Sequence, residues 1–202
     1  MKITGVLGGS FNPIHNAHLD MAECAHNQFD IPEILIMPTA ATYYKDGSAL
    51  ASPDKRMEMI RLAIKERNAE SFMKPSTLDL DRGGLTYTYD TINELRGLYD
   101  KIYFIIGTDS LMYIEKWVKA ESFLPQCTLL VSLRPGDMPD DIQKQTCFLE
   151  NDLGAHIEFM NTKVSPVSSS EIRRRIKAKK DVAGMLPDNV IRYIIKNKLY
   201  IE

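Results

Sequence analysis

Short apolar runs alternate with amphipathic stretches along the chain. Five runs have the length and composition of buried strands, and they span residues 3–8, 34–37, 102–106, 128–133 and 156–160. Leu78 and Leu80 have the two-residue spacing of a further strand. The run 102–106 is apolar throughout, which is typical of a strand buried on both faces of its sheet.

Helical periodicity fills the intervals between these runs. The predicted helices span residues 17–28, 54–67, 89–98, 168–177 and 188–197. In the second of them Pro53 stands at the start, and Met57, Ile60 and Ile64 share one face. Strands that alternate with helices predict an α/β fold whose sheet is mostly parallel, with right-handed crossovers. We expect 39–52 and 134–146 to be irregular, and loops of that length are often functional.

Composition narrows the class of protein. With 202 residues, 44% hydrophobic and 26% charged, the chain can fill one core and resembles an average globular protein. The net charge of −2 gives no global electrostatic reason to expect nucleic acid or an anionic membrane as the main partner. No apolar run approaches the roughly 20 residues of a membrane span. The N-terminal apolar run is also too short for a signal peptide, because Gly8, Gly9, Ser10 and Asn12 interrupt it.

The cysteines indicate the compartment. Cys24, Cys127 and Cys147 are odd in number, widely spaced and free of any CxxC pair. This pattern disfavours a disulfide framework or a zinc site and predicts buried thiols in a reducing environment. We therefore expect a cytoplasmic protein.

Positive charge is concentrated near the C-terminus. Residues 163–180 carry seven basic residues and one acid, a balance of +6, so that the remainder carries −8. Most of these side chains have the pattern of a solvated helix face. Arg173 differs, because it follows Ser168-Ser169-Ser170 at a helix start, where a guanidinium and backbone N–H groups can hold phosphate together.

The segment from Gly8 to His18 carries the most specific chemistry. It follows the first strand directly, so it lies where α/β sheets bind their ligands. Gly8 and Gly9 allow the backbone to approach an anion closely, and Ser10 adds a hydroxyl. His15 and His18, three residues apart at a helix start, can face one ligand and donate hydrogen bonds to phosphoryl oxygens. The segment fits neither GxGxxG nor HExxH, and GxxxxGK[ST] is absent from the chain.

Gly9-x-Phe11-x-Pro13-x-His15-x-x-His18 resembles the signature of the HxGH nucleotidyltransferase superfamily. Within it the chain resembles the bacterial nicotinate mononucleotide adenylyltransferases over almost its whole length. Further matching blocks follow in order, namely 36–38, 85–91, 105–109 with 113–117, 134–136 and 168–173. The resemblance implies a Rossmann-like open sheet with helices on both faces, and a single nucleotidyltransferase domain over 1–202 on which the C-terminal helices, about 168–202, pack.

The resemblance also implies roles for individual residues. The catalytic group would be His15, His18, Lys45 and Arg173. The ATP-binding group would be Gly8, Gly9, Ser10, Phe11, Gly107, Asp109 and Ser169. The mononucleotide-binding group would be Tyr44, Thr88, Tyr113, Trp117, Val118 and Arg134. No metal-ligating residues are expected, because Mg²⁺ can be held mainly by the phosphates of ATP.

The implied reaction is adenylyl transfer from ATP to nicotinate mononucleotide, giving deamido-NAD and pyrophosphate in NAD biosynthesis. The chain departs from the family pattern at Asn12, where Asp is usual, at Ala17, where Gly is usual, and at Tyr44, where His is usual. Tyrosine can donate a hydrogen bond but carries no positive charge. Three alternatives stay open: amidated nicotinamide mononucleotide as acceptor, another phosphate acceptor, or a non-catalytic nucleotide-binding module. The sequence is compatible with a homo-oligomer.

Overall fold

The computed structural model describes residues 1–40, 50–133, 137–162 and 167–201. Its strands form one sheet in the order β3-β2-β1-β4-β5-β6, and every neighbouring pair is parallel. The strands are β1 (Ile3–Gly9), β2 (Ile34–Pro38), β3 (Met73–Pro75), β4 (Lys101–Gly107), β5 (Thr128–Ser132) and β6 (His156–Met160). This order reverses direction between β1 and β4, and in such sheets the carboxyl ends of the strands at the reversal form the ligand crevice. The predicted α/β fold is confirmed.

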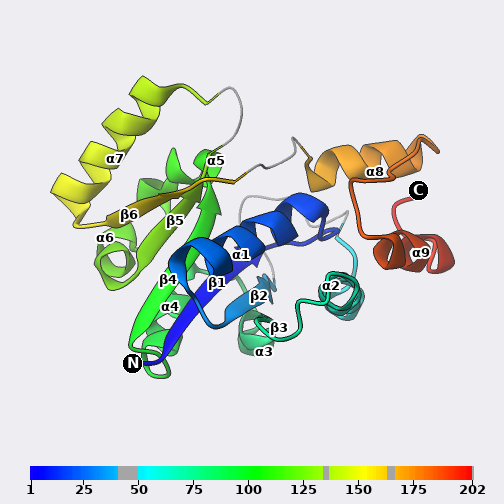
Figure 1. The fold of residues 1–202 in the computed structure, drawn as a ribbon, viewed down its shortest axis with the longest axis horizontal. Coiled ribbons are helices and arrows are strands. Elements are labelled where there is room, and N and C mark those ends of the chain that lie inside the picture. The colour runs from blue at the N-terminus through cyan, green and yellow to red at the C-terminus, as the bar shows by residue number, and fades with distance from the viewer. Residues whose placement is uncertain (41–49, 134–136, 163–166, 202) are drawn as a thin grey trace.

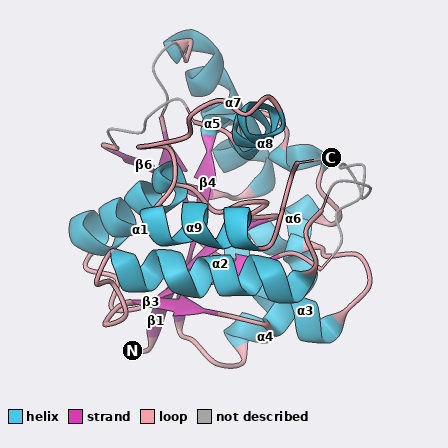
Figure 2. Cartoon of the chain, turned by 90° about the vertical axis from the view of Figure 1, so that its right-hand side faces the viewer, coloured by secondary structure: helices cyan, strands magenta, loops and turns pink. Residues whose placement is uncertain are grey.

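Helices flank the sheet on both sides (Figure 1). They are α1 (Asn16–Phe29), α2 (Pro53–Glu66), α3 (Leu78–Arg82), α4 (Thr88–Arg96), α5 (Thr108–Leu111), α6 (Ala120–Phe123), α7 (Pro139–Leu153), α8 (Ser169–Lys177) and α9 (Asp188–Lys196). The short 3₁₀ turns η2 (Ile114–Lys116) and η3 (Leu124–Gln126) follow α5 and α6 in the chain. The helix α9 lies beside α2, as Figure 2 shows from the side.

Alternate residues of the central strands enter two separate cores. Leu7 and Ile105 belong to the core that α1, α2, α8 and α9 cover, whereas Val6 and Ile106 belong to the core under α4, α6 and α7. Successive side chains of a strand point to opposite faces, so a continuous apolar run supplies both cores at once. The C-terminal helices share the first core through Ile172 of α8 and Ile194 of α9.

Two predictions about local structure are wrong. Leu78 and Leu80 lie in the short helix α3, and the edge strand is Met73–Pro75 instead. A side-chain hydrogen bond from Thr77 Oγ1 to Asp81 Oδ2 (2.6 Å) spans this helix.

The second wrong prediction concerns 134–146, where α7 begins at Pro139. Proline at the first helical position and the acidic pair Asp140 and Asp141 in the first turn favour a helix start. Leu149 is its one fully buried residue among those the structure describes, so the helix has little of the periodicity that sequence analysis detects.

The cysteine prediction holds in part. All three thiols are free, and burial raises the pKa of Cys127 to about 12. Cys147 is exposed on α7 and Cys24 is half-buried, so the expectation that all three are buried is wrong. No helix among the described residues is long and apolar enough to cross a membrane.

Candidate active site

The loop between β1 and α1 lies at the carboxyl end of β1, beside the reversal of strand order. Gly8 lines a cavity there, and a Cβ added to it would come no closer than 3.9 Å to a neighbouring heavy atom, in the Phe104 ring. Protein packing therefore does not require glycine at this position. The missing side chain at Gly8 leaves room for a ligand in the cavity to approach the backbone closely.

Buried polar groups fix the shape of this loop. Arg56 of α2 is 1% exposed, and it donates from Nη1 to the Ser10 carbonyl (2.9 Å) and from Nε to the Ala51 carbonyl (3.1 Å). Burial lowers the pKa of Arg56. Asn12 Oδ1 accepts two hydrogen bonds, from the Ala51 N–H (3.0 Å) and the Tyr200 hydroxyl (2.7 Å). The loop is thus held by residues from α2 and from the C-terminal segment.

The start of α8 is attached to the same loop. Ser169 Oγ donates to the Pro13 carbonyl (2.9 Å), and Arg173 Nη1 donates to the Asn12 carbonyl (2.8 Å). Ser168 caps the helix by accepting the Glu171 N–H (3.2 Å). Residues about 160 positions apart in the sequence are therefore side by side at this end of the sheet.

The two predicted histidines form a stacked pair. The rings of His15 and His18 are 3.6 Å apart between centroids and inclined by 17°, and Phe11 packs edge-on to His18 at 5.0 Å. The backbone N–H of His15 donates to His18 Nδ1 (3.2 Å). A ring nitrogen that accepts a hydrogen bond carries no proton, so neutral His18 carries its proton on Nε2. His18 lines the cavity, so its ring can contact a ligand bound there.

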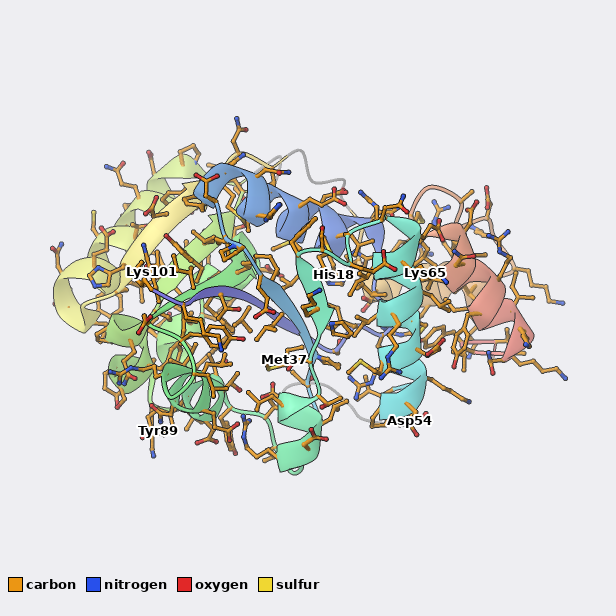
Figure 3. All side chains as sticks on the ribbon, turned by 60° about the horizontal axis from the view of Figure 1, so that its bottom comes forward. His18, Met37, Asp54, Lys65, Tyr89 and Lys101 are labelled. Carbon is orange, nitrogen blue, oxygen red and sulfur yellow. The ribbon has the colours of Figure 1, made fainter. Side chains whose placement is uncertain are left out.

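The cavity beside His18 has a volume of about 320 Å³. Its walls come from the ends of β1 and β4, the first turns of α1, α5 and α8, and the segment before α4. Figure 3 shows His18 and Met37 toward the same end of the sheet, away from Lys101 at the start of β4. A site of this size built from several strand ends is suited to a nucleotide-sized ligand.

A buried carboxylate lies in one wall of this cavity. Asp79 is 4% exposed, and its Oδ1 accepts from Thr91 Oγ1 (2.6 Å) and Arg82 Nη1 (2.9 Å). Burial raises the pKa of Asp79, while the hydrogen bonds from Thr91 and Arg82 oppose that rise. Arg82 also binds Glu94 through Nε (2.8 Å), so this network joins α3 to α4.

A family model described as cytidylyltransferase-like matches residues 6–175, which include the glycine-rich loop, the histidine pair and Arg173. The chain belongs to the cytidylyltransferase-like family. Its relatives include proteins named "Probable nicotinate-nucleotide adenylyltransferase". The one from Clostridium botulinum (strain Alaska E43 / Type E3) is 34% identical over 202 residues, all of both chains. The one from Lachnoclostridium phytofermentans is 35% identical over 203 residues, again all of both chains.

Solved structures share the fold of this cytidylyltransferase-like chain. A Plasmodium falciparum nicotinic acid mononucleotide adenylyltransferase complexed with NaAD has a TM-score of 0.79 at 24% identity, and the match covers 99% of this chain and 98% of that one. A structure of the same enzyme complexed with APC has a TM-score of 0.77 at 22% identity, with the same coverage. The Rossmann-like fold and the resemblance to nicotinate mononucleotide adenylyltransferases are confirmed.

The structure brings many of the predicted site residues of this cytidylyltransferase-like chain to one cavity. Those that line it are Gly8, Gly9, Ser10, His18, Thr88, Gly107, Asp109, Trp117 and Ser169. Trp117 is half-buried, with its ring edge-on to Phe104 at 6.3 Å between centroids. Phe11 belongs to the loop itself, is 1% exposed and packs edge-on against His18.

Other predicted residues lie elsewhere. His15 stacks on His18 but is not in the cavity wall, and Arg173 lines a second cavity. Tyr113 and Val118 are 59% and 48% exposed, outside the main cavity. The predicted positions Tyr44, Lys45 and Arg134 lie outside the described residues.

Several cavity residues were not predicted from the sequence. They are polar side chains contributed by loops and helix starts, namely Thr39, Asp79, Thr86, Thr91 and Ser110. Thr86 Oγ1 accepts the Ala40 N–H (3.0 Å), which joins the end of β2 to the segment before α4. Among the described residues no group of three or more His, Cys, Asp or Glu side chains is arranged to hold a metal ion.

Proposed function

We propose that this protein is an adenylyltransferase that converts ATP and nicotinate mononucleotide into deamido-NAD and pyrophosphate. The observation that carries the proposal is the position of His18. Its Nδ1 accepts a backbone N–H, and its ring lines the cavity at the ends of β1 and β4. The full-length similarity to relatives named for this activity supports the choice of substrate.

The reaction needs charge stabilisation more than proton transfer. An oxygen of the mononucleotide 5′-phosphate attacks the α-phosphorus of ATP, and the bond from that phosphorus to the bridging oxygen breaks to release pyrophosphate. The attacking phosphate is already an anion near neutral pH, because its second pKa is about 6. No general base is then required, and catalysis rests on alignment of the reactants and on neutralising the transferring group.

His18 is the residue best placed to stabilise that group. A donor aimed at charge that develops in the transition state lowers the barrier more than it strengthens substrate binding. His15 supports it by stacking and through its backbone N–H. In the proposal Lys45 and Arg173 add positive charge near the phosphates, and Tyr44 and Arg134 contact the mononucleotide.

The two ends of the cavity suit the two halves of the product. Gly107 ends β4 and Asp109 lies just after it, where a carboxylate can accept hydrogen bonds from the ribose hydroxyls of ATP. Gly8, Gly9, Ser10, Phe11 and Ser169 belong to the loop and helix start assigned to the phosphates. Thr88 and Trp117 line the cavity beside them, and an aromatic face suits a flat, electron-poor pyridinium ring. We assign Tyr113 and the Val118 backbone to the rim of this pocket.

Magnesium enters with ATP as part of the substrate. Mg²⁺ keeps several water ligands and can be held by phosphate oxygens together with one or two carboxylates. We also propose that residues 1–202 form one nucleotidyltransferase domain that acts in the cytoplasm. The burial of Ile172 of α8 and Val190 and Ile194 of α9 in the core of the sheet supports that unit.

Product analysis tests the proposal. The protein is incubated with ATP, Mg²⁺ and nicotinate mononucleotide, and the mixture is resolved by liquid chromatography while pyrophosphate is measured enzymatically. We expect deamido-NAD and pyrophosphate in equal amounts. Hydrolysis of ATP without deamido-NAD, or no product from a folded protein that binds ATP, would reject the assignment.

A further inference from the structure

A second cavity, of about 710 Å³, lies beside the first turn of α8. Ser169 lines the first cavity, and the next residue, Ser170, lines this one. Its walls come from the start of α2, from α8 and from the C-terminal segment after α9. Its volume falls within the range of small-molecule sites, roughly 300–1,000 Å³.

The described charged residues that line this second cavity are all basic. Five basic side chains line it, and no carboxylate is among the lining residues that the structure describes: Lys55, Arg173, Arg174, Lys177 and Lys198. They come from three elements that are distant in the sequence, so the fold gathers them. The whole chain by contrast carries a net charge of −2.

Three of these cations have no carboxylate partner among the residues that the structure describes. Arg174 is paired with Glu171 (2.6 Å). Within the described ranges no carboxylate lies at salt-bridge distance from Lys55, Lys177 or Lys198. Like charges around a cavity repel one another. Low-dielectric cavity walls also focus their positive field, which raises the local concentration of anions. An anionic ligand removes this repulsion.

Phosphate groups are the anions that this set recognises best. A guanidinium offers paired donors to phosphate oxygens, and ammonium groups act as mobile point charges. We propose that this cavity is a binding site for a small polyphosphate anion, and that inorganic pyrophosphate is its natural occupant. The choice of pyrophosphate rests on the proposed function, because that reaction releases it next to Ser169 and Ser170.

Two lining residues connect this cavity to the nucleotide loop. Arg173 Nη1 binds the Asn12 carbonyl (2.8 Å), and the Tyr200 hydroxyl binds Asn12 Oδ1 (2.7 Å). Both side chains also line the second cavity. Pyrophosphate bound there would contact two groups that hold the loop before α1, and this gives the second cavity a connection to the active site.

Binding of inorganic pyrophosphate tests this proposal without any turnover. We would titrate the full-length protein by calorimetry at fixed ionic strength, with the nucleotide cavity saturated by a non-hydrolysable ATP analogue. The test variant is the double substitution Lys177→Gln and Lys198→Gln at exposed positions. The matched control is Lys179→Gln with Lys180→Gln, which removes the same charge from exposed residues that do not line the cavity.

We expect wild type and control to bind one pyrophosphate per chain, and the test variant to bind at least about tenfold more weakly. An equal loss in the control would mean nonspecific attraction, and absence of binding to the analogue-saturated wild type would mean that pyrophosphate uses only the nucleotide cavity. Either result overturns the proposal. Because no acceptor is present, a wrong assignment of the reaction would leave this binding result unchanged and would instead appear in the product analysis.

Discussion

Replacing Arg56 by methionine should destabilise the protein far more than an average change in a helix. Arg56 is fully buried and its guanidinium donates to the carbonyls of Ser10 and Ala51 at 2.9 and 3.1 Å. Methionine fills a similar volume but offers no donor, so both carbonyls lose their charged partner. The substitution therefore separates the contribution of the Arg56 hydrogen bonds to the free energy of unfolding from the contribution of its packing.

The magnitude follows from those two bonds. A hydrogen bond to a charged group contributes about 1.5–3 kcal/mol. The variant no longer has the desolvation cost of a buried guanidinium, and this offsets part of the loss. We expect a net loss of about 3 kcal/mol in the free energy of unfolding. For a chain of this length, 1 kcal/mol corresponds to about 2–4 °C in Tm, so Tm should fall by about 6–12 °C.

Thermal unfolding followed by circular dichroism, with urea unfolding for the free energy, measures this loss. Arg61→Met is the matched control, because Arg61 lies on the same helix with its side chain 56% exposed and only a 3.5 Å pair with Glu58. Exposed pairs contribute about 0–1 kcal/mol. Arg56→Lys should be intermediate, since one ammonium group cannot match the geometry of two guanidinium donors. If Arg56→Met and Arg61→Met unfold within about 2 °C of each other, Arg56 does not hold the loop as described.

Three further substitutions test other parts of the site. His18→Ala should lower kcat about 10²–10³-fold, by analogy with loss of one transition-state donor, with an unchanged circular dichroism spectrum; steady-state kinetics near wild-type values would contradict its role. Thr91→Val should cost about 1.5–3 kcal/mol by loss of the 2.6 Å bond to Asp79. Because that bond lowers the pKa of Asp79 and favours the carboxylate, the loss measured in urea should be larger at pH 7 than at pH 3. Trp117→Ala should raise KM for nicotinate mononucleotide roughly tenfold through lost stacking while KM for ATP changes little, and Trp117→Phe should restore most of it; equal changes in both KM values would indicate general damage.

The strands of the central sheet could be predicted because each contains a short run of apolar residues in the sequence. Residues 102–106 are apolar at every position, and β4 is buried on both faces. The edge strand β3 has three residues, of which only Met73 is buried, so it carries no such signal. The nearby leucines, Leu78 and Leu80, matched strand spacing but lie in a short helix in which the residue between them, Asp79, is buried with polar partners.

Some residues of the candidate site could likewise be predicted from the sequence, and others could not. Gly8 and Gly107 lie at the carboxyl ends of β1 and β4, and His18 and Asp109 lie in the first turns of the helices that follow, so their position at the sheet edge can be inferred from the chain order. Residues that support the loop from a distance could not be found by that route, since Tyr200 reaches Asn12 across 188 positions.

For Arg56 a signal was present in the sequence. It stands next to Met57 and four residues before Ile60, within the apolar face of its helix. A charged residue at a core position of an amphipathic helix indicates a buried partner, and here the partners are the carbonyl groups of two loops.

The central claim is adenylyl transfer to the acid form of the mononucleotide, and initial rates of pyrophosphate release test it most directly. ATP and Mg²⁺ are supplied with nicotinate mononucleotide in one series and with nicotinamide mononucleotide in the other. Steady release with the acid, at a kcat/KM at least about tenfold above that of the amide, is the expected result. Equal or faster release with the amide, or none with either acceptor from a folded protein, would contradict the claim.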